Sequence, residues 1–594
     1  MRSAAFMPGL SHFFGHLLAF WPWLAAALSG VFLACGYAPF DQAWLAWIGL
    51  APLQAALWLR PRGPRARLVD LALGFVTGAG FFWIVFSWLQ NVTVGGWFIL
   101  CLYLALYPAL WAWIAGPLPH RLGRWLRGGW MKKRALATAA GTPTPEPFLP
   151  FLSSRVNLAI AFVAASAWVT TEWLRGHVMG GFGWNTLATA SHDILGMIQI
   201  AAIGGAPALS WVMAFCGTIA TLTVIRFVLE VGRTKIRPHF DFTITMALVG
   251  ACFVYGVRTL QQTAESTPLR IAMVQPNIPQ AIKWDHAYAD QILAKLIKDT
   301  RSAQGWGPDL TLWPEAATPH PFFNHGPTLH AIRNLAESMT GGLLFGSLQF
   351  TFGPQQEPQD YNVAIFFEDS KADLQVYRKL HLVPFGEYVP FRNEIPLIDR
   401  IVGDRVAGDF RSGDDPVILR FQDKPIRMAP LICFEDTLAR VTRRFLEGEN
   451  SANLLVNITN DAWFKQSAAS RQHLANARLR TVEFRRPMLR CANTGVTCTI
   501  DAGGRIRQLH QSETGDTFID GVLLGVVDVP IAPEPTPFFL YGDWVSMSSI
   551  TISSAWIMTG LITGFLRRRK RKDSAETPLS TPSPATSDSS PTKH

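Results

Sequence analysis

Eight long apolar runs constrain the fold of this chain more than any other feature of its sequence. They lie at residues 18–38, 42–59, 68–89, 95–117, 156–174, 206–229, 241–259 and 545–566. Each is close to the ~20 residues that an α-helix needs to cross a bilayer. The composition agrees, because only 16% of the residues are charged, against about one quarter in soluble domains. We therefore predict an α-helical transmembrane bundle of about eight spans, with the first run retained rather than cleaved as a signal peptide.

Basic residues predict the orientation of these spans. Clusters of arginine and lysine follow the second, fourth, sixth and eighth runs, whereas the loops at the opposite ends carry almost none apart from Arg175. The clusters comprise Arg60, Arg62, Arg65 and Arg67; Arg121, Arg124, Arg127, Lys132, Lys133 and Arg134; Arg226, Arg233, Lys235 and Arg237; and the run 567–572. Because basic residues collect on the cytoplasmic side, both termini are expected there. The net charge of +10 arises largely from these clusters, so no nucleic acid partner is expected.

The spans divide the chain into four predicted parts. Residues 1–259 form a seven-span transmembrane domain, 260–544 an exported catalytic domain, 545–566 a C-terminal transmembrane helix, and 567–594 a basic, then disordered cytoplasmic tail. In the exported part, short apolar runs alternate with helical stretches, which indicates a layered α/β domain with a buried sheet. Strands are predicted at Leu269–Val274, Asp309–Trp313, Leu343–Leu348, Val363–Phe367, Val417–Phe421, Met428–Cys433, Leu454–Ile458, Leu489–Ile500 and Gly521–Val527. Helices are predicted at Ala287–Ser302, Pro327–Met339, Thr437–Leu446 and Ser470–Phe484.

Cysteine usage points to an unpaired thiol in the exported domain. Of the seven cysteines, only Cys433, Cys491 and Cys498 lie outside the predicted spans. An odd number in an oxidising compartment leaves at least one thiol free. A bond between Cys491 and Cys498 is disfavoured, because both fall on one predicted strand. The chain contains no Cys-x-x-Cys pair and no Cys/His metal spacing, so we predict no metal and no cofactor.

Three charged or nucleophilic residues each end a strand-like segment of the exported domain. Glu315 ends Leu312-Trp-Pro-Glu, Lys379 ends Tyr377-Arg-Lys, and Cys433 follows the apolar run 428–432. A thiolate nucleophile needs a base to take its proton and a positive charge to stabilise the oxyanion that it creates. Singly, these residues have ordinary interpretations as a strand-ending turn, a surface lysine and a buried thiol. The prediction of thiol-based acyl transfer depends on their occurring together.

These motifs resemble those of a known family. Glu315 in Trp-Pro-Glu, Lys379 upstream of Val383-Pro-Phe-Gly-Glu, and Cys433 before an aromatic residue and Glu435 are similar to the Glu-Lys-Cys signature of the nitrilase, or carbon–nitrogen hydrolase, superfamily. The spans around them look like its membrane-bound apolipoprotein N-acyltransferase branch. Further matching segments are Thr171–Gly176, Gly181–Trp184, Val274–Gln280, Lys283–Asp285, Asn460–Phe464, Gln472–Leu474, Ala477–Arg478, Arg486–Pro487, Asn493–Thr497 and Tyr541–Trp544. The resemblance covers almost the whole chain.

The resemblance implies a nitrilase-like αββα sandwich and a ping-pong reaction. Glu315 would deprotonate Cys433, which would take an acyl chain from the sn-1 ester of a phospholipid as a thioester. The α-amino group of the N-terminal diacylglyceryl-cysteine of an apolipoprotein would then accept that chain, completing lipoprotein maturation. Lys379 would stabilise the oxyanion. The family further implies a multi-pass protein of the bacterial inner membrane with a periplasmic catalytic domain, and we expect a monomer.

The family also implies roles for residues around the triad. Glu387 and Glu435 match glutamates that support it. The residues that fall where the family lines its lipid-facing pocket are Trp284, Tyr388, Phe434, Asn460 and Trp463. Trp463 and Phe464 are candidates for a lid that dips into the membrane.

Three positions depart from the family pattern. Phe434 stands where Tyr is frequent, Gly183 where Pro is usual, and Lys465 where Gly is common. None of them belongs to the triad, so the departures concern how substrate is positioned rather than which reaction is catalysed.

Two other functions fit parts of the sequence. A membrane-tethered carbon–nitrogen hydrolase or amidase would use the same three residues with water as the acceptor, but it would not need the motifs within the spans, including Glu172 and Arg175. A transporter or receptor with a degenerate domain would not need an intact Glu315, Lys379 and Cys433.

Overall fold

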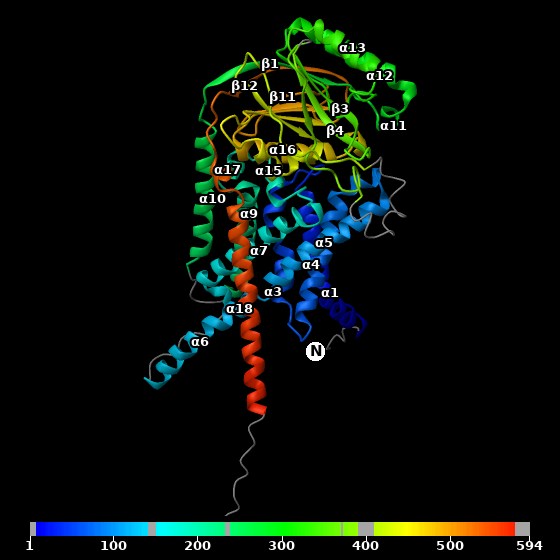
Figure 1. Cartoon of the computed structure of the whole chain (residues 1–594). Helices are drawn as coiled ribbons and strands as arrows, with labels where there is room; N and C mark the ends of the chain where they lie inside the picture. Colours follow the sequence, from blue (N-terminus) through cyan, green and yellow to red (C-terminus); the bar gives the residue numbers. More distant parts are fainter. Residues whose placement is uncertain (1–7, 141–149, 232–237, 370–371, 390–408, 576–594) are drawn as a thin grey trace, which may run out of the picture.

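The computed structural model describes residues 8–140, 150–231, 238–369, 372–389 and 409–575. A bundle of helices carries an α/β domain at one end, and two helices that flank the domain in sequence, α10 (Phe240–Thr259) and α18 (Trp544–Ala575), run along the bundle away from it (Figure 1). The predicted disordered tail lies outside the described residues beyond Ala575.

Within the part of the chain that the structure describes, six helices are long and apolar enough to cross a membrane. Besides α10 and α18 they are α4 (Ala66–Val85), α5 (Val94–Ala115), α7 (Ser154–Arg175) and α9 (Ala201–Glu230). The two other predicted spans correspond to shorter apolar segments. The first falls on α1 (Pro8–Cys35), and the second is divided between α2 (Ala43–Ile48) and α3 (Ala51–Leu59). The basic region after α5 folds as a further helix, α6 (Leu118–Ala139).

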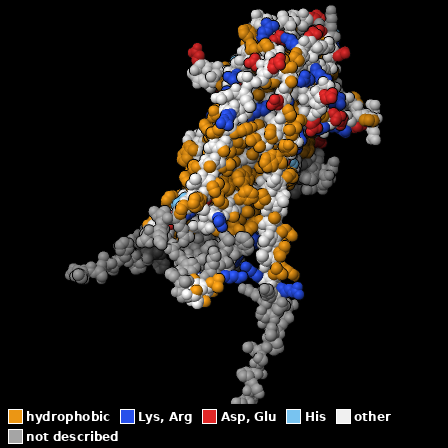
Figure 2. All heavy atoms as spheres, turned by 90° about the vertical axis from the view of Figure 1, so that its left-hand side faces the viewer, with side chains coloured by type: hydrophobic (Ala, Val, Ile, Leu, Met, Phe, Trp, Pro, Cys, Tyr) orange, Lys and Arg blue, Asp and Glu red, His pale blue; other side chains and the backbone are white. Residues whose placement is uncertain are grey.

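The face of the bundle that Figure 2 shows is mainly apolar, whereas most charged side chains on this face gather on the α/β domain. Large apolar side chains on α10 that remain exposed include Phe240, Phe242, Ile244, Met246 and Phe253. Contiguous exposed apolar surface of this extent is typical of a membrane interface rather than of a soluble monomer. The distribution therefore fits a membrane protein with one water-facing domain.

The α/β domain contains two six-stranded sheets. The first sheet has the order β12 (Gly521–Pro530), β1 (Ser266–Gln275), β2 (Leu310–Leu312), β3 (Gly342–Phe352), β4 (Pro358–Phe367) and β5 (Gln375–Arg378). The second has the order β11 (Ile506–Leu509), β10 (Cys498–Ile500), β9 (Met488–Ala492), β8 (Leu454–Thr459), β7 (Arg427–Ile432) and β6 (Leu419–Arg420). In the first sheet β1, β2 and β3 are parallel to one another, and in the second β7, β8 and β9 are. The remaining strands of each sheet pair antiparallel with their neighbours.

Helices cover the outer faces of the two sheets. α12 (Ala289–Ala303) and α13 (Gly326–Glu337) lie on the first sheet, and α15 (Ala439–Arg444) and α16 (Ala469–Phe484) lie between the second sheet and the bundle (Figure 1). In α12 the buried side chains Ile292, Leu296 and Thr300 recur every four residues, which gives the helix one apolar face. The four layers form the αββα sandwich that the family resemblance implied.

One strand prediction was wrong and two strands were missed. The expected strand Leu489–Ile500 is two antiparallel strands, β9 and β10, because the chain turns at Gly495, whose φ of +93° suits glycine. Arg490 rather than Cys491 therefore lies opposite Cys498, and all seven cysteines are free thiols. The missed strands β5 and β11 lie at the sheet edges and contain charged or amide side chains instead of an apolar run.

Candidate active site

The nucleophile candidate Cys433 occupies a tight turn directly after β7. It begins the 3₁₀-helix η8 (Cys433–Thr437) and has a φ of +53°, a left-handed conformation that non-glycine residues rarely adopt. Such a backbone costs about 1 kcal/mol or more and persists only where neighbours hold it. The Asn457 side-chain amide donates to the Cys433 carbonyl oxygen at 3.1 Å, and His473 Nε2 lies 3.3 Å from the same oxygen.

Glu435 connects this turn to the segment that carries Lys379. Its carboxylate accepts hydrogen bonds from the Ile432 backbone N–H (2.8 Å), the Tyr377 hydroxyl (2.8 Å), and the backbone N–H groups of Leu380 (2.8 Å) and His381 (3.0 Å). Burial raises the pKa of Glu435 to about 7, opposed by Lys379 and by these donors. Four donors on one carboxylate favour its ionised form and fix the two segments relative to each other.

Lys379 and Glu315 lie together in the buried interior. Lys379 follows β5 and is 1% exposed, and Glu315 follows β2 and is 7% exposed. Lys379 Nζ lies 2.8 Å from the carboxylate of Glu387 and 3.7 Å from Glu315 Oε1. Asn362 Nδ2 donates to both carboxylates, at 2.8 Å for Glu315 and 3.1 Å for Glu387. We call the group of Lys379, Glu315 and Glu387 the acid–lysine cluster.

The charges of this cluster act directly on the thiol. Burial, followed by the Glu315 charge, raises the pKa of Cys433 well above its ordinary value, and Lys379 opposes the shift. Burial also disfavours the ammonium form of Lys379, but Glu387, Glu315 and Cys433 outweigh it, so the pKa of Lys379 is raised. The resting site therefore contains a neutral thiol, a fixed ammonium and a carboxylate, and the thiol needs a base to become a nucleophile.

The site also includes residues to which the sequence assigned no role. Lys283 is buried beside Glu315, its Nζ donates to the Glu315 carbonyl oxygen at 3.0 Å, and burial lowers its pKa to about 8. Tyr377 and Asn362 orient Glu435 and the two carboxylates of the acid–lysine cluster. Lys283 could have been found from its place in the Lys-Trp-Asp motif. Asn362 gives no signal, because a lone asparagine in a strand has no characteristic spacing.

The five predicted pocket residues divide into two groups. Trp284 and Trp463 are each 43% exposed, and Tyr388 is half-buried. Phe434 is buried, with its ring stacked on Trp184 of the bundle at 6.1 Å between centroids. Asn460 is buried too, and its side chain donates to Gln280 at 3.0 Å and accepts from Asn493 at 2.9 Å. The first group presents surface to a ligand, and the second shapes the interior.

The nucleophile turn faces the helical bundle. The end of η8, at Thr437, lines a cavity of about 110 Å³ together with Glu172 and Gly183 from the membrane part of the chain. Arg440 donates to the carbonyl oxygens of Gly176 (2.8 Å) and Gly180 (3.2 Å), which binds α15 to the loop after α7. The candidate site therefore lies at the end of the α/β domain that meets the bundle.

The structure describes the surroundings of Gly183 and Lys465, two of the positions that depart from the family pattern. A side chain at Gly183 would meet the Thr437 carbonyl oxygen at 3.5 Å, an ordinary contact, so the missing proline ring leaves space there. Lys465 adopts φ +52° and ψ −161°, a conformation that is natural for glycine. The lid candidate Phe464 packs edge-on against Trp88 at 4.5 Å between ring centroids.

Within the described residues, no group of three or more His, Cys, Asp or Glu side chains is arranged to hold a metal ion. The charged side chains of the site instead pair with one another, as in the acid–lysine cluster.

Comparison with known proteins gives matches over most of the chain. Residues 29–219 match the apolipoprotein N-acyltransferase N-terminal domain family, and residues 270–529 match the carbon–nitrogen hydrolase family. The chain is 30% identical over 552 residues to the apolipoprotein N-acyltransferase of Geobacter metallireducens, covering 90% of this chain and 94% of that protein. It is 29% identical to the enzyme of the same name from Methylococcus capsulatus, covering 93% and 97%. A solved bacterial amidase, NitN, aligns over 44% of this chain and 93% of its own, with 16% identity and a TM-score of 0.31.

Proposed function

Because this chain belongs to the apolipoprotein N-acyltransferase family, the membrane-bound acyltransferase branch of the nitrilase superfamily, we propose that it moves a fatty acyl chain from the sn-1 position of a phospholipid to the N-terminus of a lipoprotein. The acceptor is the α-amino group of an N-terminal diacylglyceryl-cysteine. The observation that carries the proposal is that Glu315 and Lys379, from separate strands, lie 3.7 Å apart and that both charges act on the Cys433 thiol.

The first half-reaction forms the acyl-enzyme. Glu315 takes the proton of the Cys433 thiol, and the thiolate attacks the ester carbonyl carbon of the phospholipid. The carbonyl oxygen becomes negative, and the Lys379 ammonium, held by Glu387, stabilises that charge. Collapse of the tetrahedral intermediate breaks the ester C–O bond. The departing lysophospholipid oxygen takes the proton from Glu315, and a thioester remains on Cys433.

The second half-reaction transfers the chain to the lipoprotein. The neutral α-amine attacks the thioester carbonyl, and Glu315 accepts the proton that the nitrogen loses. Lys379 stabilises the second oxyanion in the same position. Breaking the C–S bond gives the amide and returns the thiol with a proton from Glu315. Two steps through one covalent intermediate allow two bulky lipids to use one site in turn.

The proposal also assigns each part of the chain a location relative to the inner membrane. Residues 1–259 and 545–566 anchor the protein in the inner membrane, 260–544 face the periplasm, and 567–594 lie in the cytoplasm with the N-terminus. The contact of η8 with the bundle supports this arrangement, because a donor with long acyl chains has to reach Cys433 from the membrane. Trp284, Tyr388 and Trp463 are proposed to contact the lipids, with Phe434 and Asn460 shaping the wall behind them.

Intact-mass analysis tests the acyl-enzyme directly. The full-length protein in detergent is incubated with a phospholipid of defined sn-1 chain, and we expect a mass gain of one acyl group. Cys433→Ala should show no gain, whereas Cys498→Ala, which removes a buried thiol elsewhere in the second sheet, should acylate normally. Acylation of the Cys433→Ala protein would refute the assignment.

A second incubation separates transfer from hydrolysis. With labelled phospholipid and a diacylated lipopeptide, the acyltransferase should place the label on the peptide amine. Free fatty acid as the sole labelled product would instead support the membrane-tethered hydrolase.

A further inference from the structure

We propose that four buried charged side chains beneath the nucleophile form an electrically neutral unit that positions Cys433 and controls how readily its thiol ionises. The unit, called here the charge quartet, consists of His473, Arg490, Asp436 and Asp461. It belongs to neither the predicted triad nor its supporting glutamates. The inference rests on the proposed function only in taking Cys433 as the nucleophile.

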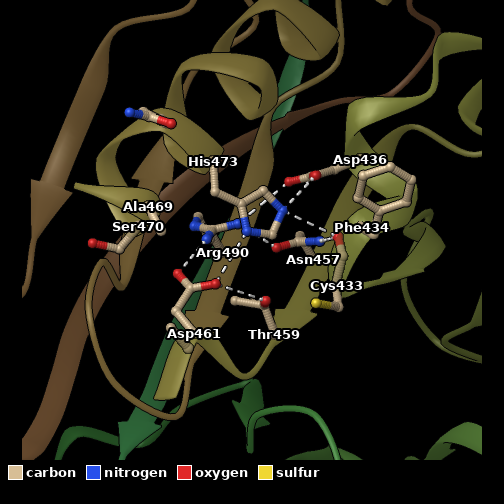
Figure 3. A network of polar contacts seen from close by, with 12 residues as sticks. Cys433, Phe434, Asp436, Asn457, Thr459, Asp461, Ala469, Ser470, His473 and Arg490 are labelled. Atoms are coloured by element: carbon tan, nitrogen blue, oxygen red, sulfur yellow. Dashed lines mark hydrogen bonds and ion pairs between the residues drawn. The ribbon is translucent and has the colours of Figure 1, made fainter. Parts of the chain in front are cut away.

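The quartet is a closed ring of hydrogen-bonded ions. His473 Nε2 lies 2.8 Å from Asp436, and Nδ1 lies 3.1 Å from Asp461 (Figure 3). Arg490 completes the ring with contacts of 3.3 Å to Asp436 and 2.9 Å to Asp461. All four side chains are at most 1% exposed. A carboxylate on each ring nitrogen requires both nitrogens to carry protons, so His473 is an imidazolium.

The four residues of the quartet come from four different elements of the α/β domain. Asp436 belongs to η8, Asp461 begins the short 3₁₀-helix η9 (Asp461–Phe464), His473 lies on α16, and Arg490 lies on β9. The charged and titratable groups facing the imidazole are thus Asp436, Asp461 and Arg490, with the Cys433 turn beside them. Burial disfavours the imidazolium, but its two aspartates outweigh burial and Arg490 and raise the pKa of His473 to about 9.

Three contacts connect the quartet to the nucleophile. His473 Nε2 approaches the Cys433 carbonyl oxygen, and Asn457, which donates to that oxygen, is held by Arg490 Nη1 at 2.7 Å. The Thr459 hydroxyl donates to Asp461 at 3.3 Å and lies between that carboxylate and the Cys433 sulfur (Figure 3). The left-handed backbone of Cys433 is therefore held from the carbonyl side by Asn457 and His473.

The net charge of the quartet matters because its four side chains are almost completely buried. Two cations and two carboxylates cancel, but the individual charges reach the thiol: Asp461 opposes the thiolate, and Arg490 and the Cys433 thiolate attract each other. In a buried site such interactions are several times stronger than in water. Loss of the His473 charge would leave one uncompensated negative charge under the sulfur, and loss of the Asp461 charge would leave one positive charge.

If the charges of the quartet act on the Cys433 thiol, removing a negative and removing a positive charge should shift its titration in opposite directions. A merely structural role would not produce opposite shifts. Asp461→Asn should move the titration of the Cys433 thiol to lower pH, and His473→Gln should move it to higher pH, each by about one unit. The double variant is neutral again, so its titration should return close to wild type. A structural defect, in contrast, would make the double variant worse than either single one.

The measurement is the rate of Cys433 alkylation by iodoacetamide in the full-length protein, followed by peptide mass between pH 7 and pH 10. Because only the thiolate reacts, the rate constant at pH 8 should rise about tenfold in Asp461→Asn and fall about tenfold in His473→Gln. Glu337→Gln changes the charge equally on the exposed side of α13 and should leave the rate unchanged.

Two outcomes would overturn the proposal: shifts of the same sign in both single variants, or a double variant that shows the sum of two losses. If His473→Gln does not fold, Asp461→Asn alone remains decisive, because an unchanged or slower rate contradicts the charge argument. Alkylation uses no lipid. A protein that alkylates as predicted but gains no acyl group from phospholipid would therefore refute the proposed function while leaving the quartet intact.

Discussion

Two buried charge clusters act on Cys433, and they are built differently. The acid–lysine cluster comes from the first sheet and contains one cation, Lys379, between two carboxylates. The charge quartet comes from the second sheet and its helices and contains two cations that alternate with two carboxylates. Both act on the same thiol.

The difference shows how one site separates reactivity from positioning. In the acid–lysine cluster, Glu315 accepts one hydrogen bond from Asn362 and lies 3.7 Å from Lys379, so it keeps the capacity to take a proton. In the quartet, each aspartate is bonded to both His473 and Arg490. A saturated neutral unit resists proton transfer and is suited to hold a backbone in an unfavourable conformation.

The substitution with the largest expected effect is Glu315→Gln, which tests whether the acid–lysine cluster supplies the base. An amide of the same shape cannot accept the thiol proton, so the rate of acyl-enzyme formation should fall by roughly 10²–10⁴-fold. Intact-mass kinetics with phospholipid measure the rate. Glu337→Gln is the matched control on the surface of α13 and should acylate like wild type. Normal acylation of Glu315→Gln would remove the acid–lysine cluster from the chemistry.

Glu435→Gln tests the connection between the Cys433 turn and the segment that carries Lys379. One end of the new side chain is an NH₂ group, which leaves a buried donor facing another donor, a loss of about 1–3 kcal/mol. We expect a thermal midpoint lower by several degrees and acylation slowed by roughly tenfold or more. Tyr377→Phe removes one of the four donors and should cause a smaller loss of both. Equal losses in the two variants would show that Glu435 does not link the segments.

Glu315, Lys379 and Cys433 could be predicted from sequence because each ends a strand-like segment. Trp-Pro before Glu315 and the apolar run before Cys433 are local signals, and the co-occurrence of the three residues indicated a shared site. The family resemblance then supplied Glu387 and Glu435. The alternation of short apolar runs and helices predicted a layered α/β domain, and the αββα order of its layers was implied by the family resemblance.

The quartet was not predicted, because its members come from four elements, and the family-matching segments that contain Asp461 and His473 assigned no role to either residue. His473 and Arg490 look like ordinary polar residues of a helix and a strand. Arg490 was also hidden by the expectation of one strand over 489–500, which gave no reason to place its side chain next to Asp436. Only the turn at Gly495 and the packing of α16 on the second sheet bring the four charges together.

The pH dependence of stability gives a smaller test of the quartet. The pKa of His473 is about 9 in the folded protein and near 6.5 in an unfolded chain. The folded state therefore binds this proton more tightly, and the resulting stability is complete below about pH 6.5 and lost as pH rises through 9. The thermal midpoint of the wild type in detergent should fall between pH 7 and pH 10. In His473→Gln the fall should be shallower; an equal slope would show that His473 does not carry the proton.

The smallest expected effect concerns Lys465, which directly follows η9. Lys465 and Cys433 both have positive φ, but they differ in what holds them. Side chains bond to the Cys433 carbonyl oxygen, whereas the Lys465 N–H donates to the Ala462 carbonyl oxygen within its own turn. Its ψ of −161° lies in a region that glycine alone enters easily. Lys465→Gly should therefore raise the free energy of unfolding by about 1 kcal/mol, measured as a higher thermal midpoint. Lys465→Ala, which removes the charge but keeps the Cβ atom, should give no gain. A gain in the alanine variant would assign the cost to the charge of Lys465 rather than to its backbone.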